Sequence, residues 1–225
     1  MAVALTLFAA QARAQFAGSI TLSSDYRFRG VSLSDDRPSA QLALDYDLPS
    51  TGWYAGGMVA SARIDPRQAA QLLVYTGYAS RLTTNLSGDA GVRYTRFTGR
   101  ESYAYAEAYA GLTYGQLVGR IYYAPDYFKF GYPALYAELN DSHTITGKWY
   151  AFGHVGYLRR GGDVADYHAS RYRSDFRLGV GLALAPCDVQ LSWSTVRGAD
   201  YEVFGYPASE GVTRNAWIFS VSYAW

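Results

Sequence analysis

The sequence is short of cysteine, lysine and charge. Its single cysteine, Cys187, excludes an internal disulfide and any zinc site built from several cysteines. Lysine occurs only at Lys129 and Lys148. Asp, Glu, Lys and Arg make up 17% of the 225 residues, against roughly 25% in an ordinary soluble domain. A formal net charge of +1 argues against a nucleic-acid binder or an acidic tail.

Long apolar runs are also missing. Beyond residue 14 no stretch of about 18 apolar residues occurs, so the sequence predicts no transmembrane helix. Aromatic residues are abundant, at 16% of the chain with 22 tyrosines, although the mean hydropathy is only −0.13. This combination favours a β-sheet whose two faces meet different solvents.

The first residues have the features of an export signal. The short apolar run from Ala2 to Ala10 is followed by Ala12-Arg13-Ala14, the A-x-A pattern of a signal-peptidase site. We therefore expect residues 1–14 to be a signal peptide and the mature domain to be residues 15–225. The basic segment that normally begins such a peptide is missing, which suggests a clipped signal. The alternative is an ordinary hydrophobic N-terminal segment.

The end of the chain alternates between large and small side chains. Large residues occupy every second position, at Trp217, Phe219, Val221, Tyr223 and Trp225. A period of two places them on one face of a β-strand. A last strand that ends on an aromatic residue resembles the signal by which the barrel assembly machinery recognises bacterial outer-membrane barrels. We assign this role to the five large residues.

The same alternation recurs along the chain and predicts about twelve strands. They are expected at residues 17–28, 38–48, 52–63, 69–80, 86–97, 103–113, 116–125, 132–139, 143–158, 171–184, 188–196 and 213–225. Most approach the length of about 9–11 residues that a tilted membrane strand needs. Short connections alternate with longer ones, as in transmembrane barrels. The sequence thus predicts an all-β, antiparallel, up-and-down transmembrane barrel rather than a soluble sandwich.

Strand parity assigns the charged residues to the inner face, because an Arg or Lys on the lipid face costs about 2–4 kcal/mol at the membrane midplane. The predicted pore-lining residues are Asp25, Arg27, Arg29, Asp45, Arg93, Glu107, Arg120, Glu138, Lys148, His154, Arg171, Arg173, Asp175 and Arg177. Eight cations against five anions indicate a polar pathway with a mild preference for anions. The alternative is a lumen plugged by ion pairs, because Arg cross-braces carboxylates well.

The opening motif runs from Ser24 to Ser32, and Arg37-Pro38-Ser39-Ala40-Gln41 follows it. There we expect Asp25, Arg27 and Arg29 on one face of the first strand, as part of a constriction. Gly30 is interpreted as a turn residue that begins the first outer loop.

This opening motif resembles that of the TorF family, a proteobacterial outer-membrane family classed as porins. The likeness continues at residues 106–112, at residues 132–138, at residues 154–157 and through the closing strands. The resemblance implies a porin in the outer membrane of a Gram-negative bacterium, without naming its solute.

Two other functions stay open. An outer-membrane lipase would need a serine, a histidine and a polar third residue. Ser142-His143 with Asn140 is placed in a turn, and His168 lies near Asp166 and Ser170 in a loop, so neither set is strong evidence.

A structural or adhesive barrel could instead act through two long outer loops, at residues 159–170 and 197–212. Their aromatic residues are Tyr167, Tyr201, Phe204 and Tyr206. The favoured hypothesis is a monomeric channel in outer-membrane lipid for passive diffusion of small polar or anionic solutes. It is expected to be no enzyme, to bind no nucleic acid, and to need no cofactor or metal.

Overall fold

The computed structural model describes residues 16–64, 67–98, 103–162, 171–198 and 214–225. The strands are β1 (Phe16–Ser23), β2 (Arg27–Phe28), β3 (Val31–Ser32), β4 (Ser39–Asp47), β5 (Trp53–Ile64), β6 (Arg67–Arg81), β7 (Leu86–Phe97), β8 (Ala104–Tyr114), β9 (Leu117–Ala124), β10 (Ala134–Thr146), β11 (Trp149–Arg160), β12 (Tyr172–Leu184), β13 (Cys187–Arg197) and β14 (Asn215–Ala224). A 3-10 turn, η1 (Tyr127–Lys129), follows β9. In the described ranges no helix is long and apolar enough to cross a membrane.

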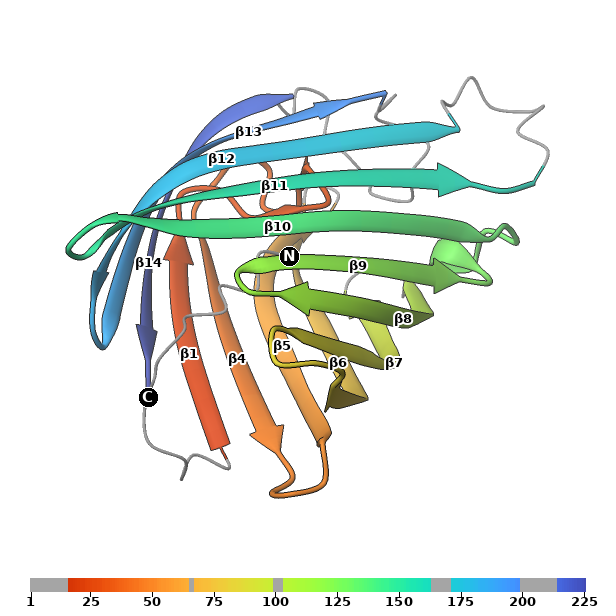
Figure 1. Ribbon diagram of the computed structural model, residues 1–225. Helices are drawn as coiled ribbons and strands as arrows, with labels where there is room; N and C mark the ends of the chain where they lie inside the picture. The colour runs from red at the N-terminus through yellow and green to blue at the C-terminus, as the bar shows by residue number, and fades with distance from the viewer. Residues whose placement is uncertain (1–15, 65–66, 99–102, 163–170, 199–213) are drawn as a thin grey trace.

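Twelve of the strands form one closed barrel (Figure 1). Each pairs antiparallel with its neighbour along the chain, and β1 closes the ring against β14, with Ser19 opposite Ala224. Closure leaves no unpaired edge, which is the condition for a sheet surrounded by lipid. The predicted twelve-stranded antiparallel barrel is therefore confirmed, and the soluble sandwich is wrong.

The outer face of the barrel is apolar. Along β12, for example, Phe176, Leu178 and Val180 are 41%, 66% and 43% exposed, whereas Arg173 and Asp175 of the other parity are buried. The same alternation runs through the other barrel strands. So many exposed, large apolar side chains are typical of a surface that contacts lipid rather than water.

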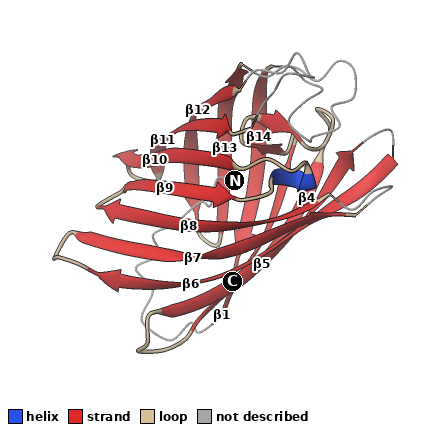
Figure 2. Ribbon diagram, turned by 90° about the vertical axis from the view of Figure 1, so that its right-hand side faces the viewer, coloured by secondary structure: helices blue, strands red, loops and turns tan. Residues whose placement is uncertain are grey.

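The two ends of the barrel differ. One end carries the short turns, such as Gly147-Lys148 and Ala185-Pro186. The connection between β6 and β7 belongs to this end and is visible at the left of Figure 2. The other end carries the connections after β1, β5, β7, β9, β11 and β13. We call these the short-turn end and the loop end.

The first predicted strand is too long. β1 ends at Ser23, and residues 24–34, here called the lumen hairpin, turn into the barrel around the small β2–β3 ladder. Arg29 and Gly30 form its tip with φ of 51° and 78°, the left-handed pair of a two-residue hairpin turn. Gly30 is thus a turn residue as predicted, but its turn lies inside the lumen rather than at the start of an outer loop.

The predicted turn at residues 140–142 is also wrong. β10 continues to Thr146, and Gly147, with φ of 54°, makes the turn instead. Asn140 stays in the strand as the register partner of His154, and its side-chain oxygen also bonds His154 Nδ1 (2.7 Å). The strands predicted at 132–139 and 143–158 are therefore Ala134–Thr146 and Trp149–Arg160, and Lys148 lies exposed in the turn, not on the wall.

Gly30 offers a test of how tightly the hairpin is packed. A Cβ at Gly30 would lie 2.5 Å from Asp175 Cβ, whereas one at Gly115, also at positive φ, would meet nothing within 4 Å. We expect Gly115→Ala to cost about 1–2 kcal/mol of folding free energy from backbone strain alone. Gly30→Ala should cost about 1–3 kcal/mol more, from overpacking. Urea unfolding in lipid vesicles measures both, and equal losses would contradict the packing.

Candidate functional site

The lumen holds most of the predicted inner-face residues. Nine face it from barrel strands: Asp45, Arg93, Glu107, Arg120, Glu138, His154, Arg173, Asp175 and Arg177. Asp25, Arg27 and Arg29 also lie in the lumen, but the hairpin carries them and they form no part of the wall. Two placements fail, since Lys148 is in the turn described above and Arg171 is exposed just before β12.

A buried ion pair joins the hairpin to the wall. Arg29 Nη2 lies 2.7 Å from Glu107 Oε1, and Arg93 Nη2 lies 2.6 Å from Glu107 Oε2. Arg29 and Glu107 are each only 2% exposed. One carboxylate thus binds two guanidinium groups, one from the hairpin and one from β7.

Aromatic rings complete the surroundings of these two arginines. The Arg29 guanidinium carbon lies 4.2 Å from the ring centroid of Tyr136, and that of Arg93 lies 3.9 Å from the centroid of Tyr122. A desolvated cation over a ring face gains about 2 kcal/mol or more. The rings therefore help to stabilise the second positive charge, which Glu107 alone does not neutralise.

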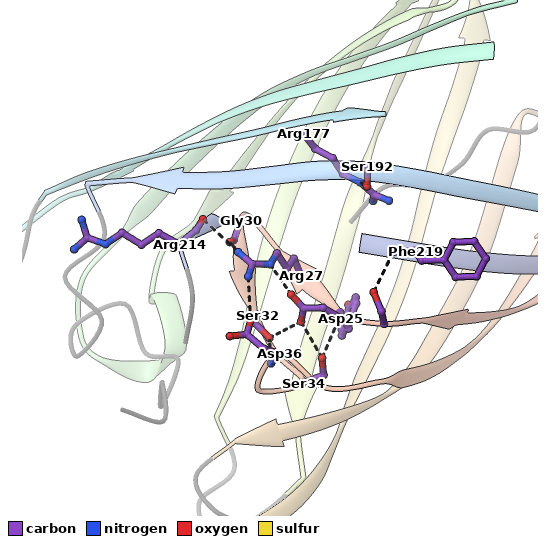
Figure 3. A network of polar contacts seen from close by, with 12 residues as sticks. Asp25, Arg27, Gly30, Ser32, Ser34, Asp36, Arg177, Ser192, Arg214 and Phe219 are labelled. Atoms are coloured by element: carbon purple, nitrogen blue, oxygen red, sulfur yellow. Dashed lines mark hydrogen bonds and ion pairs between the residues drawn. The ribbon is translucent and has the colours of Figure 1, made fainter. Parts of the chain in front are cut away.

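A second carboxylate organises the hairpin itself (Figure 3). Asp25 accepts hydrogen bonds from Ser32 Oγ (2.6 Å) and Ser34 Oγ (3.0 Å), and Arg27 Nε donates to it at 2.6 Å. Ser34 Oγ also accepts from the Tyr26 backbone N–H at 2.8 Å. These bonds satisfy the Asp25 carboxylate and the serine hydroxyls that the hairpin brings out of water.

The hairpin is packed as a core element. Phe28, Val31 and Leu33 are 1%, 5% and 2% exposed and join one apolar cluster with residues of the wall. The Leu33 carbonyl accepts a hydrogen bond from the Arg63 N–H (2.7 Å). Burial raises the pKa of Tyr26, whose hydroxyl stays protonated and donates to Gln71 Oε1. The hairpin therefore occupies and narrows the lumen toward the loop end.

Toward the short-turn end the lumen is open. A cavity of about 230 Å³ extends from the hairpin to the rim at Pro186, Cys187 and Ala224. Uncharged polar side chains of β1, β4, β13 and β14 line one wall: Ser19, Thr21, Ser23, Gln41, Gln190, Ser194, Ser220 and Ser222. Such groups offer many hydrogen bonds and no fixed charge.

Side chains on other parts of the wall lie along it rather than across the lumen. Asp89, Gly111 and Arg120 are register partners on three successive strands, and the Arg120–Asp89 ion pair (2.9 Å) passes over Gly111. A Cβ at Gly111 would meet Asp89 Oδ1 at 2.6 Å, so only glycine leaves room for the pair. Tyr75 reaches Asp45 over Gly56 in the same way. These glycines keep the centre of the lumen free.

Arg177 differs from the paired arginines. Its Nε donates to Ser192 Oγ at 2.8 Å, and its guanidinium carbon lies 5.3 Å from the Phe152 ring centroid. It lines the cavity and forms no ion pair with any described residue. Its neighbour Asp175 is instead occupied by His154 Nε2 (2.7 Å). Arg177 is thus a positive charge without a counter-ion among the described residues, and the carboxylates Asp45 and Asp188 line the same cavity.

Sequence reasoning missed several lumen residues. Asp89 and Asp188 face inward, and Asp188 accepts a hydrogen bond from the Tyr150 hydroxyl at 2.7 Å. Parity could have identified Asp89, because it lies four residues before Arg93 on the same strand. Asp188 was hidden by its position next to a predicted turn.

The structure gives little support to the catalytic and adhesive sites considered as alternatives. Ser142 and His143 are adjacent on β10 and point to opposite faces, so they form no catalytic pair. Asp166, His168 and Ser170 lie outside the described residues, as do Tyr167, Tyr201, Phe204 and Tyr206, and residues 1–14. Within the described ranges no His, Cys, Asp and Glu side chains are grouped as a metal site would require.

The buried pair at Glu107 predicts a large mutational effect. Glu107→Gln leaves two buried guanidinium groups without a counter-charge, so we expect a loss of about 3–5 kcal/mol of unfolding free energy. Asp89→Asn breaks the more exposed pair with Arg120 and should cost about 1 kcal/mol. Equilibrium unfolding in vesicles compares the two, and a loss no larger for Glu107→Gln would disprove the anchoring role.

Comparison with solved structures supports the fold. The chain is similar to the KdgM porin (TM-score 0.58, 11% identity) and to the NanC porin (TM-score 0.57, 12% identity). In both cases the match covers 92% of this chain and 98% of the other. A further match is the "KdgM porin in complex with disordered oligogalacturonate" (TM-score 0.56, 9% identity, 92% and 98% covered). At such identities the likeness establishes a porin-like barrel fold.

Comparison of sequences gives the family. No curated protein matches the chain. The profile of the Gcw_chp family, described as a bacterial protein of unknown function, matches residues 9–225, nearly the whole chain. The chain therefore belongs to the Gcw_chp family.

Proposed function

We propose that this protein is a porin-like channel in the bacterial outer membrane, through which small polar or anionic solutes diffuse passively. The observation that carries the proposal is the cavity between the lumen hairpin and the short-turn end, which has polar side chains along one wall and Arg177 on its lining. A cavity with hydrogen-bonding walls lets a solute exchange its water for protein groups, and an unpaired cation attracts anions. The expected mechanism needs no cofactor and no chemical step.

The placement in the membrane follows from the apolar outer face. The short turns would lie in the periplasm and the longer connections outside, as is usual for transmembrane barrels. Residues 1–14 would be removed on export. The alternating residues from Trp217 to Trp225 would direct insertion by the assembly machinery. The resemblance of residues 24–41 to the TorF family supports the same placement.

The solute class is supported by two lines of argument. Arg177 favours a negative group, and the solved KdgM complex names oligogalacturonate, an acidic sugar polymer, as bound to that porin. The lumen hairpin restricts the width, so we expect this barrel to pass small solutes.

Ion selectivity tests the role of Arg177. We expect the refolded barrel in a planar bilayer to give discrete current steps with an anion-biased reversal potential under a salt gradient. Arg177→Gln should shift that potential toward cations, because it removes the unpaired positive charge from the cavity. Lys148→Gln removes an equal charge from the exposed turn and serves as the control. The role of Arg177 would be excluded if both variants kept the wild-type potential.

A second function is favoured by the packing of the hairpin. The buried side chains of residues 25–34 suit a barrel that conducts nothing and acts through its outer connections as a structural or adhesive protein. This alternative predicts a correctly folded barrel without current over many insertions. Heat-modifiable gel migration would establish that the inserted protein is folded.

A further inference from the structure

Strands β11, β12 and β13 lie side by side (Figure 1), and each has an arginine at or next to its loop end. Arg159 is the last but one residue of β11, Arg171 directly precedes β12, and Arg197 is the last residue of β13. All three are exposed. None of them forms an ion pair with a residue in the described part of the chain.

Two of these arginines lie on either side of one exposed tyrosine. Arg159 is the register partner of Tyr172 on the β11 side. On the β13 side the chain approaches just after Arg197, since a Cβ at Gly198 would lie 2.5 Å from the Tyr172 carbonyl oxygen. Tyr172 is 44% exposed and stacks on Tyr157 with ring centroids 5.9 Å apart.

Parity turns both arginines toward the outside of the barrel. Arg159 continues the exposed series of Val155 and Tyr157 on β11, and Arg197 has the parity of the exposed Leu191 on β13. The apolar band therefore ends in tyrosine rings and then in guanidinium groups. In a bilayer this is the level of the lipid headgroups, where tyrosine is enriched.

The chemistry of the cluster fits phosphate. The planar guanidinium group binds phosphate oxygens with two parallel hydrogen bonds, and two such groups close together attract a doubly charged anion strongly. Toward the short-turn end the outward-facing residue Asp141 carries a negative charge instead. Its carboxylate is bonded to His143 Nε2 (2.8 Å). Among the described residues the short-turn end has no comparable group of neighbouring arginines.

We propose that Arg159 and Arg197, astride Tyr172, bind the phosphate-bearing headgroup of a lipid in the outer leaflet of the membrane. Arg171 adds positive charge beside them. The site requires the barrel to lie in a bilayer, but it does not require the lumen to conduct. It would fix both the depth of the barrel and the lipid that surrounds β11–β13.

Lipid retention tests the site. The full chain is folded in mixed micelles, titrated with diphosphorylated lipid A, and the bound lipid is counted by native mass spectrometry. We expect the Arg159→Gln/Arg197→Gln double variant to bind about a hundredfold more weakly than wild type, about tenfold for each lost charge-assisted pair. Lipid A without phosphates should bind wild type as weakly as the variant. Inorganic phosphate at the same concentration should not displace the lipid.

Two variants act as controls. Arg96→Gln removes an exposed, outward-facing arginine at the same end of β7, away from the cluster, and should retain lipid as wild type does. Arg159→Lys/Arg197→Lys keeps the charge and should bind with intermediate strength. Its lipid binding also tests the site if the glutamine double variant does not fold.

Equal binding by wild type and either double variant would overturn the proposal. A loss for Arg96→Gln as large as that for the double variant would do the same, because it would show a general effect of charge. Equal retention of dephosphorylated lipid would show that acyl chains alone are recognised.

Discussion

The arrangement of the lumen depends on the buried pair between Arg29 and Glu107. Without it, the hairpin would bring a guanidinium group out of water with no counter-charge, at a cost of several kcal/mol. With it, Glu107 binds an arginine of the hairpin and one of the wall, and the rings of Tyr122 and Tyr136 cover both cations. A segment that begins as the continuation of a strand is thereby held across the lumen.

The hairpin that this pair holds in place divides the lumen into a packed part and an open part. Toward the loop end the hairpin packs with the wall like a protein core, and its polar groups bond partly to one another and partly to wall residues such as Glu107 and Gln71. Toward the short-turn end glycines such as Gly56 and Gly111 let long side chains lie flat on the wall, so space remains at the centre. The two expectations drawn from the charged residues, an open pathway and a plug of ion pairs, therefore describe different halves of one lumen.

Strand periodicity was enough to predict the barrel, because outward positions in the middle of the strands are mostly apolar and this signal repeats in twelve strands. It failed at residues 24–28, where Asp25, Arg27 and Arg29 continue the alternation of β1 although the chain has left the sheet. Contacts with Gln71 and Glu107, distant in the sequence, decide that fold, and parity carries no information on them.

The turn after β10 shows the same limit. Asn140, Asp141 and Ser142 have the composition of a turn, but bonds such as that between Asn140 and His154 keep them in the strand. Residues that lie correctly on a face, such as Arg177 and Arg93, could be predicted. Which of them is paired could not, because pairing depends on the register across several strands.

We expect the lumen hairpin to be the main barrier to solutes inside the barrel. The most direct measurement is single-channel current through wild type and through a variant in which residues 25–34 are replaced by a short Gly-Ser linker, both verified as folded barrels. The account predicts a clearly larger current for the variant, whether or not wild type conducts. An unchanged current would contradict it and would place the barrier to solutes elsewhere in the barrel.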